Sequence, residues 1–360
     1  MSHIVVDRPA DAPAALARLD ATKPLALDTE FMRERTYFPQ LALLQCADSD
    51  GHIVLFDPLD AGMKAPLAAL VGAATALMHS ASEDLVAFRH ALGVLPRRLY
   101  DTQIAAAFAG LGAGVGYQAL VKTLLGVELA KAETRSDWLR RPLSAQQLVY
   151  AADDVRHLHA AVEALDQRLK ARGQSDRALA DMARMLENAR EERDEPQPHL
   201  AMKPAAQLDR LSQARLRRLL RWREIAARRK DLPKRWLLDN DLALTLARRP
   251  PTTMQALDAA LATARSARSL RDEIAELLAA PLDADEAQMP LASDNERADR
   301  ARLKALQTVV TELAISLDLP EGLLCARRHL ESLLADREWP GALEGWRREV
   351  LEIPLRRALG

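Results

Sequence analysis

An acidic pair follows an apolar run near the start of the chain. Residues 25–27 are Leu-Ala-Leu, and Asp28-Thr29-Glu30 comes next. In a β-strand, residues i and i+2 project from the same face, so the carboxylates of Asp28 and Glu30 would lie side by side. Like charges held close together are costly unless something neutralises them, and a divalent cation is the usual candidate. A strand that has simply reached solvent explains the same residues, so this pair alone does not establish a metal site.

A second acidic segment follows another apolar run. Residues 75–78 are Thr-Ala-Leu-Met, and Ser82-Glu83-Asp84 lies shortly after them, where a helical pattern begins. Ser82 is a natural N-cap, and the two acids suit the first helical turn electrostatically, which is a sufficient structural explanation. The functional explanation is that Asp84 faces the same pocket as the first pair. Taken alone, this segment favours the structural explanation.

A tyrosine and an aspartate share a helical face later in the chain. Tyr150 and Asp154 are four residues apart, which places both on one side of a helix. Asp153 points about 100° away, so only one of the two neighbouring acids accompanies the tyrosine. A tyrosine in mid-helix is more often a packing residue, and this segment is also weak evidence by itself.

The elements that must position these residues differ between the two halves of the chain. Apolar runs typical of strands occur at 25–31, 41–45, 53–56 and 75–78, with helical patterns between them that include 65–71 and 85–92. Mixed elements of this kind predict an α/β layer fold, a sheet covered by helices. From Ser144 onward every periodic segment is helical.

Two polar stretches divide the helical half. Residues 187–206 and 280–297 are charged and contain prolines, which is typical of linkers. The resulting units are an α/β domain at 1–190 and two small all-α domains at 205–280 and 295–360. The two small units have similar lengths, which would fit a duplicated module.

Composition excludes several classes of protein. The chain has 360 residues, 50 Lys+Arg and 51 Asp+Glu, so it is not a polycation and is long enough for several cores. Its two cysteines, Cys46 and Cys325, form no CxxC, which excludes a disulfide scaffold or a zinc ribbon. Neither a signal peptide nor a stretch of about 20 apolar residues is present. We therefore expect a cytoplasmic protein without membrane contact, and a monomer because no dimerisation heptads occur.

Together, the three acidic segments resemble the DEDD superfamily of 3′–5′ exonucleases. The histidine type of that superfamily carries His five residues before the last Asp, and this chain has Val149 there, so the tyrosine type is indicated. Segments 27–31, 35–41, 79–84, 136–143 and 150–155 resemble the ribonuclease D family within it. The resemblance spans nearly all of residues 1–165 and implies a ribonuclease H-like mixed sheet flanked by helices.

The resemblance implies a role for each acid. Asp28 would bridge two divalent metal ions, Mg²⁺ or Mn²⁺, while Glu30 and Asp154 complete the site on the nucleophile's side. Asp84 would hold the second ion, and Tyr150 would orient the attacking water. The implied function is a metal-dependent 3′–5′ exoribonuclease, a hydrolase that trims structured RNA such as tRNA precursors and releases 5′-mononucleotides.

A basic segment in the second unit suggests how RNA is held. Residues 210–235 contain eleven Lys+Arg against two acids, whereas residues 1–190 contain 21 against 23. A solvated helix face would account for part of this charge, but phosphate binding is the simplest use. Residues 216–240 resemble the HRDC module, a small nucleic-acid-binding domain, and the last unit resembles a second, divergent copy. The candidate phosphate contacts are Arg217, Arg221, Arg228, Arg229 and Lys230.

Other candidates and alternatives stay open at this stage. Phe31, Tyr37 and Trp138 are placed to stack on bases, although core packing is favoured for Phe31. Arg140 would meet a phosphate or merely face solvent, with equal weight. Within the superfamily, the alternative activity is that of a DNA 3′–5′ exonuclease. A non-catalytic RNA-binding protein is a weaker alternative, because all four acids are present.

Overall fold

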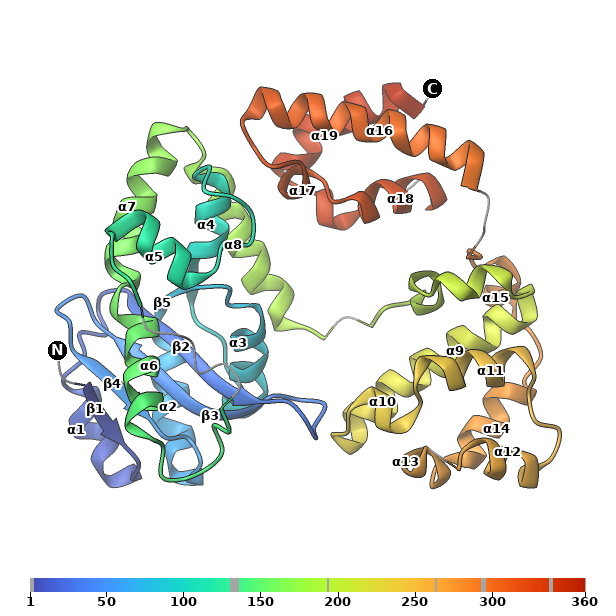
Figure 1. The fold of residues 1–360 in the computed structure, drawn as a ribbon, viewed down its shortest axis with the longest axis horizontal. Helices are drawn as coiled ribbons and strands as arrows, with labels where there is room; N and C mark the ends of the chain where they lie inside the picture. Colours follow the sequence, from blue (N-terminus) through green and yellow to red (C-terminus); the bar gives the residue numbers. More distant parts are fainter. Residues whose placement is uncertain are drawn as a thin grey trace.

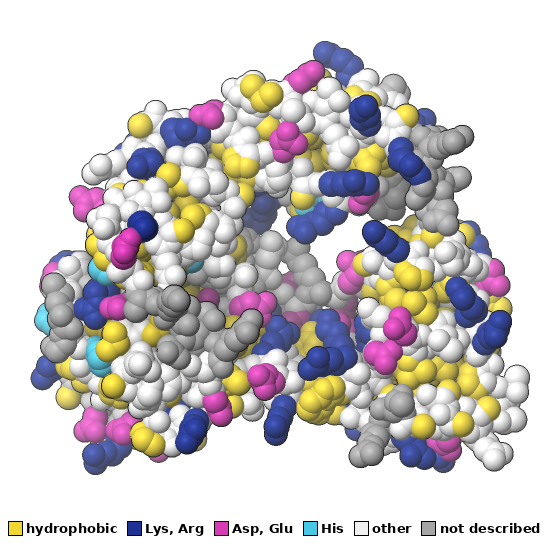
Figure 2. Space-filling view, viewed as in Figure 1, with side chains coloured by type: hydrophobic (Ala, Val, Ile, Leu, Met, Phe, Trp, Pro, Cys, Tyr) yellow, Lys and Arg dark blue, Asp and Glu magenta, His cyan; other side chains and the backbone are white. Residues whose placement is uncertain are grey.

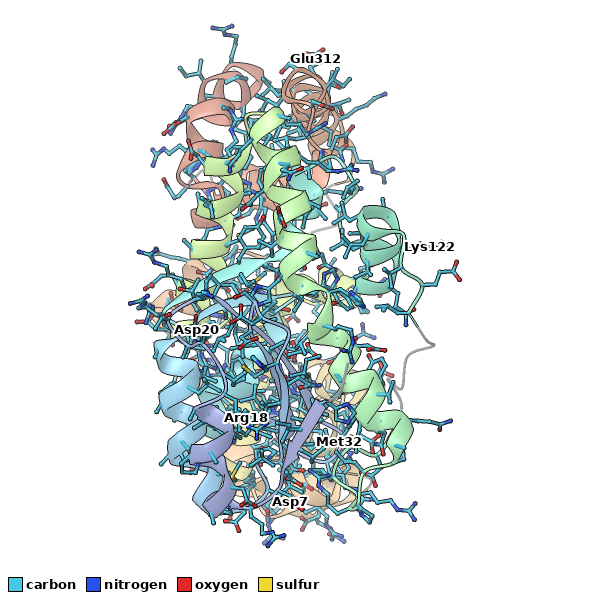
Figure 3. The ribbon with its side chains drawn as sticks, turned by 90° about the vertical axis from the view of Figure 1, so that its left-hand side faces the viewer. Asp7, Arg18, Asp20, Met32, Lys122 and Glu312 are labelled. Carbon is cyan, nitrogen blue, oxygen red and sulfur yellow. The ribbon has the colours of Figure 1, made fainter. Side chains whose placement is uncertain are left out.

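Three groups of elements surround a central opening (Figures 1 and 2). The structure is a computed structural model, and it describes residues 3–129, 136–192, 194–262, 264–292, 296–336 and 339–359. An α/β unit comes first in the chain, and two groups of helices follow it. Figure 3 shows the last helical group, near Glu312, stacked at one end of the α/β unit.

The α/β unit contains one mixed sheet of six strands. The strands are β1 (His3–Val6), β2 (Leu25–Met32), β3 (Gln40–Ala47), β4 (Ile53–Phe56), β5 (Thr75–Met78) and β6 (Arg98–Asp101). Their order is β1-β4-β3-β2-β5-β6, with β3 antiparallel to both of its neighbours and the other pairs parallel. The predicted α/β fold is therefore confirmed, including its four expected strands. Strands β1 and β6 were not predicted; they are the two edge strands of the sheet.

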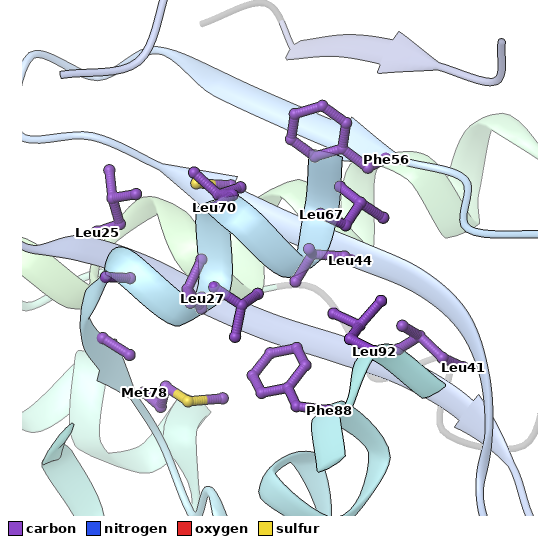
Figure 4. Close-up of a cluster of buried hydrophobic side chains, with 14 of the residues drawn as sticks. Leu25, Leu27, Leu41, Leu44, Phe56, Leu67, Leu70, Met78, Phe88 and Leu92 are labelled. Carbon is purple, nitrogen blue, oxygen red and sulfur yellow. The ribbon is translucent and has the colours of Figure 1, made fainter. Parts of the chain in front are cut away.

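Helices cover both faces of this sheet. They are η1 (Pro9–Asp11), α1 (Ala12–Leu16), η2 (Ala61–Met63), α2 (Lys64–Ala73), α3 (Ser82–Ala87), η3 (Phe88–Leu92), α4 (Thr102–Phe108), α5 (Tyr117–Leu125), α6 (Ala145–Arg156), α7 (Leu158–Ala171) and α8 (Ser175–Arg190). On one face, Leu27, Leu44, Phe56 and Phe88 belong to a fully buried core (Figure 4). On the other face, α6 packs across β2, β3 and β4.

The local sequence explains where α6 begins. The hydroxyl of Ser144 accepts a hydrogen bond from the backbone N–H of Gln147, and the Gln147 side chain accepts one from the backbone N–H of Ser144. This capping box satisfies two backbone donors that a helix start leaves unpaired. Ala151, Ala152 and Val155 then face the sheet, so small residues let α6 approach β2 closely.

The second group of helices has its own core. It comprises η4 (Pro198–Ala201), η5 (Lys203–Gln207), α9 (Arg210–Lys230), α10 (Lys234–Leu237), α11 (Asn240–Arg248), α12 (Met254–Ala260), α13 (Arg265–Arg268), α14 (Arg271–Ala279) and α15 (Ala284–Gln288). Leu216, Leu219 and Trp222 of α9 lie in this core. Residues 281–292 pack against α9 instead of forming the linker that their composition indicates, because Glu286 is buried in an ion pair with Arg218.

The third group contains α16 (Glu296–Leu317), α17 (Glu321–Leu324), α18 (Arg327–Asp336), η6 (Gly341–Leu343) and α19 (Trp346–Leu359). Leu306, Leu330 and Leu351 lie in a core of its own. The expected helical character of the C-terminal half is confirmed, while the assignment of the two groups to HRDC modules stays a prediction. None of the helices that the structure describes combines the length and the apolar character that crossing a membrane requires.

Candidate active site

Three carboxylates meet where α6 crosses β2. Asp28, Glu30 and Asp154 each offer an oxygen, and these oxygens all lie within 4.8 Å of one another. Asp28 and Glu30 share one face of β2, as their spacing predicts, and Asp154 reaches them from α6. The register places Asp28 opposite Gln45 and Glu30 opposite Leu43, so apolar and amide side chains surround the cluster.

The carboxylates of this cluster hold their protons unusually well. Burial raises the pKa of Glu30 to about 9, and Asp154 and Asp84 add to the shift. Burial also raises the pKa of Asp154 to about 7, partly offset by a hydrogen bond from Tyr150. The pKa of Asp28 lies well above its ordinary range, because of burial and then Asp84, Asp154 and Glu30. A positive charge placed between these carboxylates would lower their pKa values.

Asp84 lies beside the cluster and bonds differently. It is the third residue of α3, and its Oδ1 accepts a hydrogen bond from the Thr29 hydroxyl. Burial raises the pKa of Asp84 to about 6, while the bond from Thr29 lowers it. The hydrogen bond with Thr29 places the second acidic segment against β2, next to the first, and the charge of Asp84 raises the pKa of Asp28.

Tyr150 lies next to Asp154 on α6, one turn away. Burial and then the charge of Asp154 raise the pKa of Tyr150 above its ordinary value. The ring of Trp138 lies against it, with centroids 6.1 Å apart, and Trp138 is 2% exposed. The Tyr150 phenol therefore stays neutral and able to donate a hydrogen bond, and the Trp138 ring packs against it.

Sequence reasoning missed two polar residues that contact the acids. Thr29 lies between Asp28 and Glu30, so strand alternation turns it to the opposite face, where it meets Asp84. Gln45 is fully buried, and its Nε2 lies 3.4 Å from Asp28 Oδ2. The buried polar residue in the apolar run 41–47 was the available signal for Gln45.

The three aromatic candidates for base stacking differ in exposure: Trp138 is buried, whereas Phe31 and Tyr37 are partly exposed. Phe31 packs against the main core, the role favoured for it from sequence. The prediction for Trp138 is wrong, because its ring is buried against Tyr150. The hydroxyl of Tyr37 lies between Glu224 and Arg228 of α9, and a stacking role for its ring stays a prediction.

The basic candidates fall into two classes. Arg217 is buried and pairs with Asp285 at 2.7 Å, so its predicted phosphate contact is wrong. Arg228 pairs with Asp194 at 2.6 Å and donates to the Tyr37 hydroxyl at 3.1 Å, which uses its guanidinium inside the protein. The exposed candidates are Arg140, Arg221, Arg229, which also pairs with Glu273 at 2.9 Å, and Lys230.

The donor set fits hard divalent cations. Carboxylate oxygens are the ligands that Mg²⁺ and Mn²⁺ prefer, and Asp28, Glu30 and Asp154 supply them from a rigid strand and a rigid helix. Burial and nearby negative charge raise the pKa values of all three acids, so a bound cation would stabilise their ionised forms.

Comparisons with known proteins agree with this geometry. Residues 3–170 match a family model described as 3′–5′ exonuclease. The chain is 48% identical over 340 residues to ribonuclease D of Xanthomonas oryzae pv. oryzae, covering 93% of each chain. It is 33% identical over 363 residues to ribonuclease D of Escherichia coli K12, covering 97% of this chain and 96% of that one. The crystal structure of Escherichia coli RNase D, described as an exoribonuclease involved in structured RNA processing, superimposes with a TM-score of 0.83 at 31% identity and covers 100% of this chain and 99% of that one.

Proposed function

The chain belongs to the ribonuclease D family and is a 3′–5′ exoribonuclease, and from that premise we propose its substrate and mechanism. We propose that it trims the 3′ ends of structured RNA such as tRNA precursors, by hydrolysis that depends on two divalent ions, and releases 5′-mononucleotides. The observation that carries the mechanism is the cluster of Asp28, Glu30 and Asp154 oxygens within 4.8 Å of one another.

The four acids would have different roles in binding the ions. Asp28, Glu30 and Asp154 would hold them directly, and Asp84 would complete the site from α3. Mg²⁺ or Mn²⁺ held there would lower the pKa of a water molecule and would stabilise negative charge on the phosphate oxygens. Thr29 keeps Asp84 oriented by donating its hydroxyl hydrogen bond to Oδ1.

Tyr150 would orient the attacking water. Its raised pKa keeps the phenol protonated at neutral pH, so it serves as a hydrogen-bonding group and not as a general base. The buried ring of Trp138 limits the positions that the Tyr150 side chain can adopt. Precise positioning of a nucleophile accounts for a large part of catalysis at such sites.

The helical groups would supply RNA affinity. Arg221 and Lys230 are exposed on α9, and phosphate contacts from such side chains would make RNA binding depend steeply on salt. Similarity to an exoribonuclease of structured RNA supports RNA as the substrate. Action on tRNA precursors, a cytoplasmic location and a monomeric state remain our predictions.

A time course tests this function directly. A 3′-extended tRNA-like RNA and a DNA of the same sequence are incubated with the protein and Mg²⁺, Mn²⁺ or EDTA. We expect stepwise shortening of the RNA from its 3′ end with either metal and none in EDTA. Faster shortening of the DNA would reassign the substrate, and cleavage that persists in EDTA would contradict the metal-dependent mechanism.

A further inference from the structure

A pocket of about 330 Å³ lies where α8 of the α/β unit meets the third group of helices. We call it the α8 pocket. Its charged and histidine lining residues are Asp181 and Arg184 of α8, Arg328 and His329 of α18, and Arg347 of α19. These residues come from positions more than 140 apart in the chain, so only the packing of the two units creates the pocket.

The α8 pocket carries more positive than negative charge. Arg347 is buried and donates to Asp181 Oδ2 at 2.6 Å, and Arg184 lies 3.3 Å from the other oxygen of the same carboxylate. Two arginines therefore share one aspartate. Arg328 is exposed, and it forms no ion pair or hydrogen bond with any residue that the structure describes.

This excess positive charge contributes to lowering the pKa values of His329 and Arg184. Burial lowers the pKa of His329, and Arg328, Arg184 and Arg347 each lower it further. Burial also lowers the pKa of Arg184, with Asp181 opposing the shift and Arg347 adding to it. Positive charges that lower the pKa values of neighbouring basic groups disfavour one another. A bound anion would offset this repulsion and stabilise the charged forms.

A second pocket connects this region with the helix that carries Asp84. It has a volume of about 420 Å³ between α3 and α8, and it shares Asp181, Arg184 and Asn188 with the α8 pocket. Its lining begins at Ser82, two residues before Asp84, and includes Arg89. The two pockets thus lie in succession along α8, one beside α3 and the other beside the third helical group. Lys and Arg side chains border the opening between the units (Figure 2).

We propose that the α8 pocket binds a backbone phosphate of the RNA strand whose 3′ end occupies the acidic site. This inference rests on the proposed function, since RNA is the polyanion that the enzyme must hold. Guanidinium groups bind phosphate through charge-assisted and often bidentate hydrogen bonds. The third helical group, through Arg328, then becomes part of the RNA-binding surface together with α8.

Helix α18 offers a matched pair of variants for the test. Arg327 and Arg328 are adjacent and exposed, but Arg327 pairs with Glu331 at 2.7 Å and does not line the pocket. Arg328→Glu and Arg327→Glu change the net charge equally in the full-length protein. The affinity of each for a fluorescent 3′-extended hairpin RNA is measured by anisotropy in EDTA, which prevents hydrolysis.

We expect Arg328→Glu to weaken RNA binding about tenfold or more at ~0.1 M salt, and Arg327→Glu by less than about threefold. Arg328→Ala should reduce the slope of log affinity against log salt concentration by about one, the signature of one lost phosphate contact. Arg327→Glu should hydrolyse a tetranucleotide RNA in Mg²⁺ at the wild-type rate, because Arg327 lies outside the α8 pocket and the acidic site.

Two results would overturn the proposal. Equal weakening in both variants would indicate general attraction and no pocket, and unchanged binding by Arg328→Glu would remove the contact. Failure of the wild-type protein to bind or shorten RNA would instead contradict the proposed function, so the two failures are distinguishable.

Discussion

At the scale of single residues, the acidic cluster combines burial with mutual repulsion. Asp28 and Glu30 come from one strand and Asp154 from a helix packed across it. Burial raises the pKa of Asp28 and Glu30, and Asp154 adds to both shifts. The buried carboxylates therefore lower the stability of the metal-free protein, and a bound cation would offset that loss.

The first prediction concerns charge removal at the proposed metal ligands. Asp28→Asn or Asp154→Asn should lower the rate of RNA hydrolysis by more than about a hundredfold, since even the partners of metal ligands are worth 10- to 100-fold. RNA affinity in EDTA should change little. Asp153→Asn is the matched control, because Asp153 pairs with Arg156 at 2.8 Å on the same helix. Near-normal hydrolysis by Asp28→Asn would exclude the proposed metal site.

The second prediction concerns pH. The pKa of Glu30 rises from 4.5 to about 9 on folding, so between those pH values the folded protein keeps a proton that the unfolded chain has lost. The stability of the metal-free protein must therefore fall as pH rises through that window. Glu30→Gln removes this penalty and should raise the melting temperature by roughly 5 °C near pH 8, with little effect near pH 4.5.

Thermal denaturation in EDTA and in Mg²⁺ checks the pH prediction. Mg²⁺ should stabilise the wild-type protein more at pH 8 than at pH 5, because protons leave the carboxylates when the cation binds. A wild-type melting temperature in EDTA that does not change between pH 5 and pH 8 would contradict the raised pKa of Glu30.

At the scale of elements, the turn between β2 and β3 joins the sheet to α9. The backbone N–H groups of Tyr37 and Phe38 both donate to Asp231 Oδ1 at 3.0 Å, and Asp231 is the left-handed C-cap of α9 with φ 48°. The Tyr37 hydroxyl donates to Glu224 and accepts from Arg228. Since β2 carries Asp28 and Glu30, this contact sets the position of the second helical group relative to the acidic site.

Removal of the Tyr37 hydroxyl should therefore affect structured substrates selectively. We expect Tyr37→Phe to raise the KM for a 3′-extended hairpin RNA about fivefold, the equivalent of ~1 kcal/mol for a lost hydrogen bond, with kcat on a tetranucleotide unchanged. Tyr100→Phe is the control, because the Tyr100 hydroxyl donates to Asp166 at 2.7 Å within the α/β unit. An equal KM increase in both variants would indicate loss of stability alone.

At the scale of the whole molecule, a buried ion pair holds the third group on the α/β unit. Asp181 and Arg347 are both buried, and Trp346 Nε1 also donates to Asp181 at 3.1 Å. Trp346 lies edge-on to Phe108, with centroids 5.8 Å apart. Arg347→Met would leave the Asp181 carboxylate buried without its main partner, so the free energy of unfolding should fall by about 3–5 kcal/mol.

Chemical denaturation measures that change. The double variant Asp181→Asn and Arg347→Met should recover part of the lost stability, because it removes the unpaired charge as well. If the two single substitutions and the double one are simply additive, the pair contributes nothing through mutual contact.

Deletion of residues 205–360 tests how far the helical groups serve binding alone. We expect weaker binding to structured RNA and lower stability, since the deletion exposes Asp181 and Phe108, while hydrolysis of a tetranucleotide continues. Gel assays on both substrates measure this separation. Loss of tetranucleotide hydrolysis by a folded truncated protein would mean that the tail completes the active site.

Features that depend on short-range geometry were predictable from the sequence. The i, i+2 spacing of Asp28 and Glu30 and the i, i+4 spacing of Tyr150 and Asp154 are properties of a strand and a helix, so each face was predictable before the fold was known. The strong periodicity of the central strands and of the C-terminal helices likewise predicted the α/β fold and the helical tail.

The polar side chains that pair with one another inside the protein were not predictable, because their partners are distant in sequence. Tyr37 and Glu224 are 187 residues apart, Arg217 and Asp285 are 68 apart, and Asp181 and Arg347 are 166 apart. The charge of α9 looks available to RNA in the sequence, yet acids of residues 283–286 neutralise part of it. No local pattern encodes such pairs, because an ion pair forms between whichever groups the packing of distant elements brings within reach.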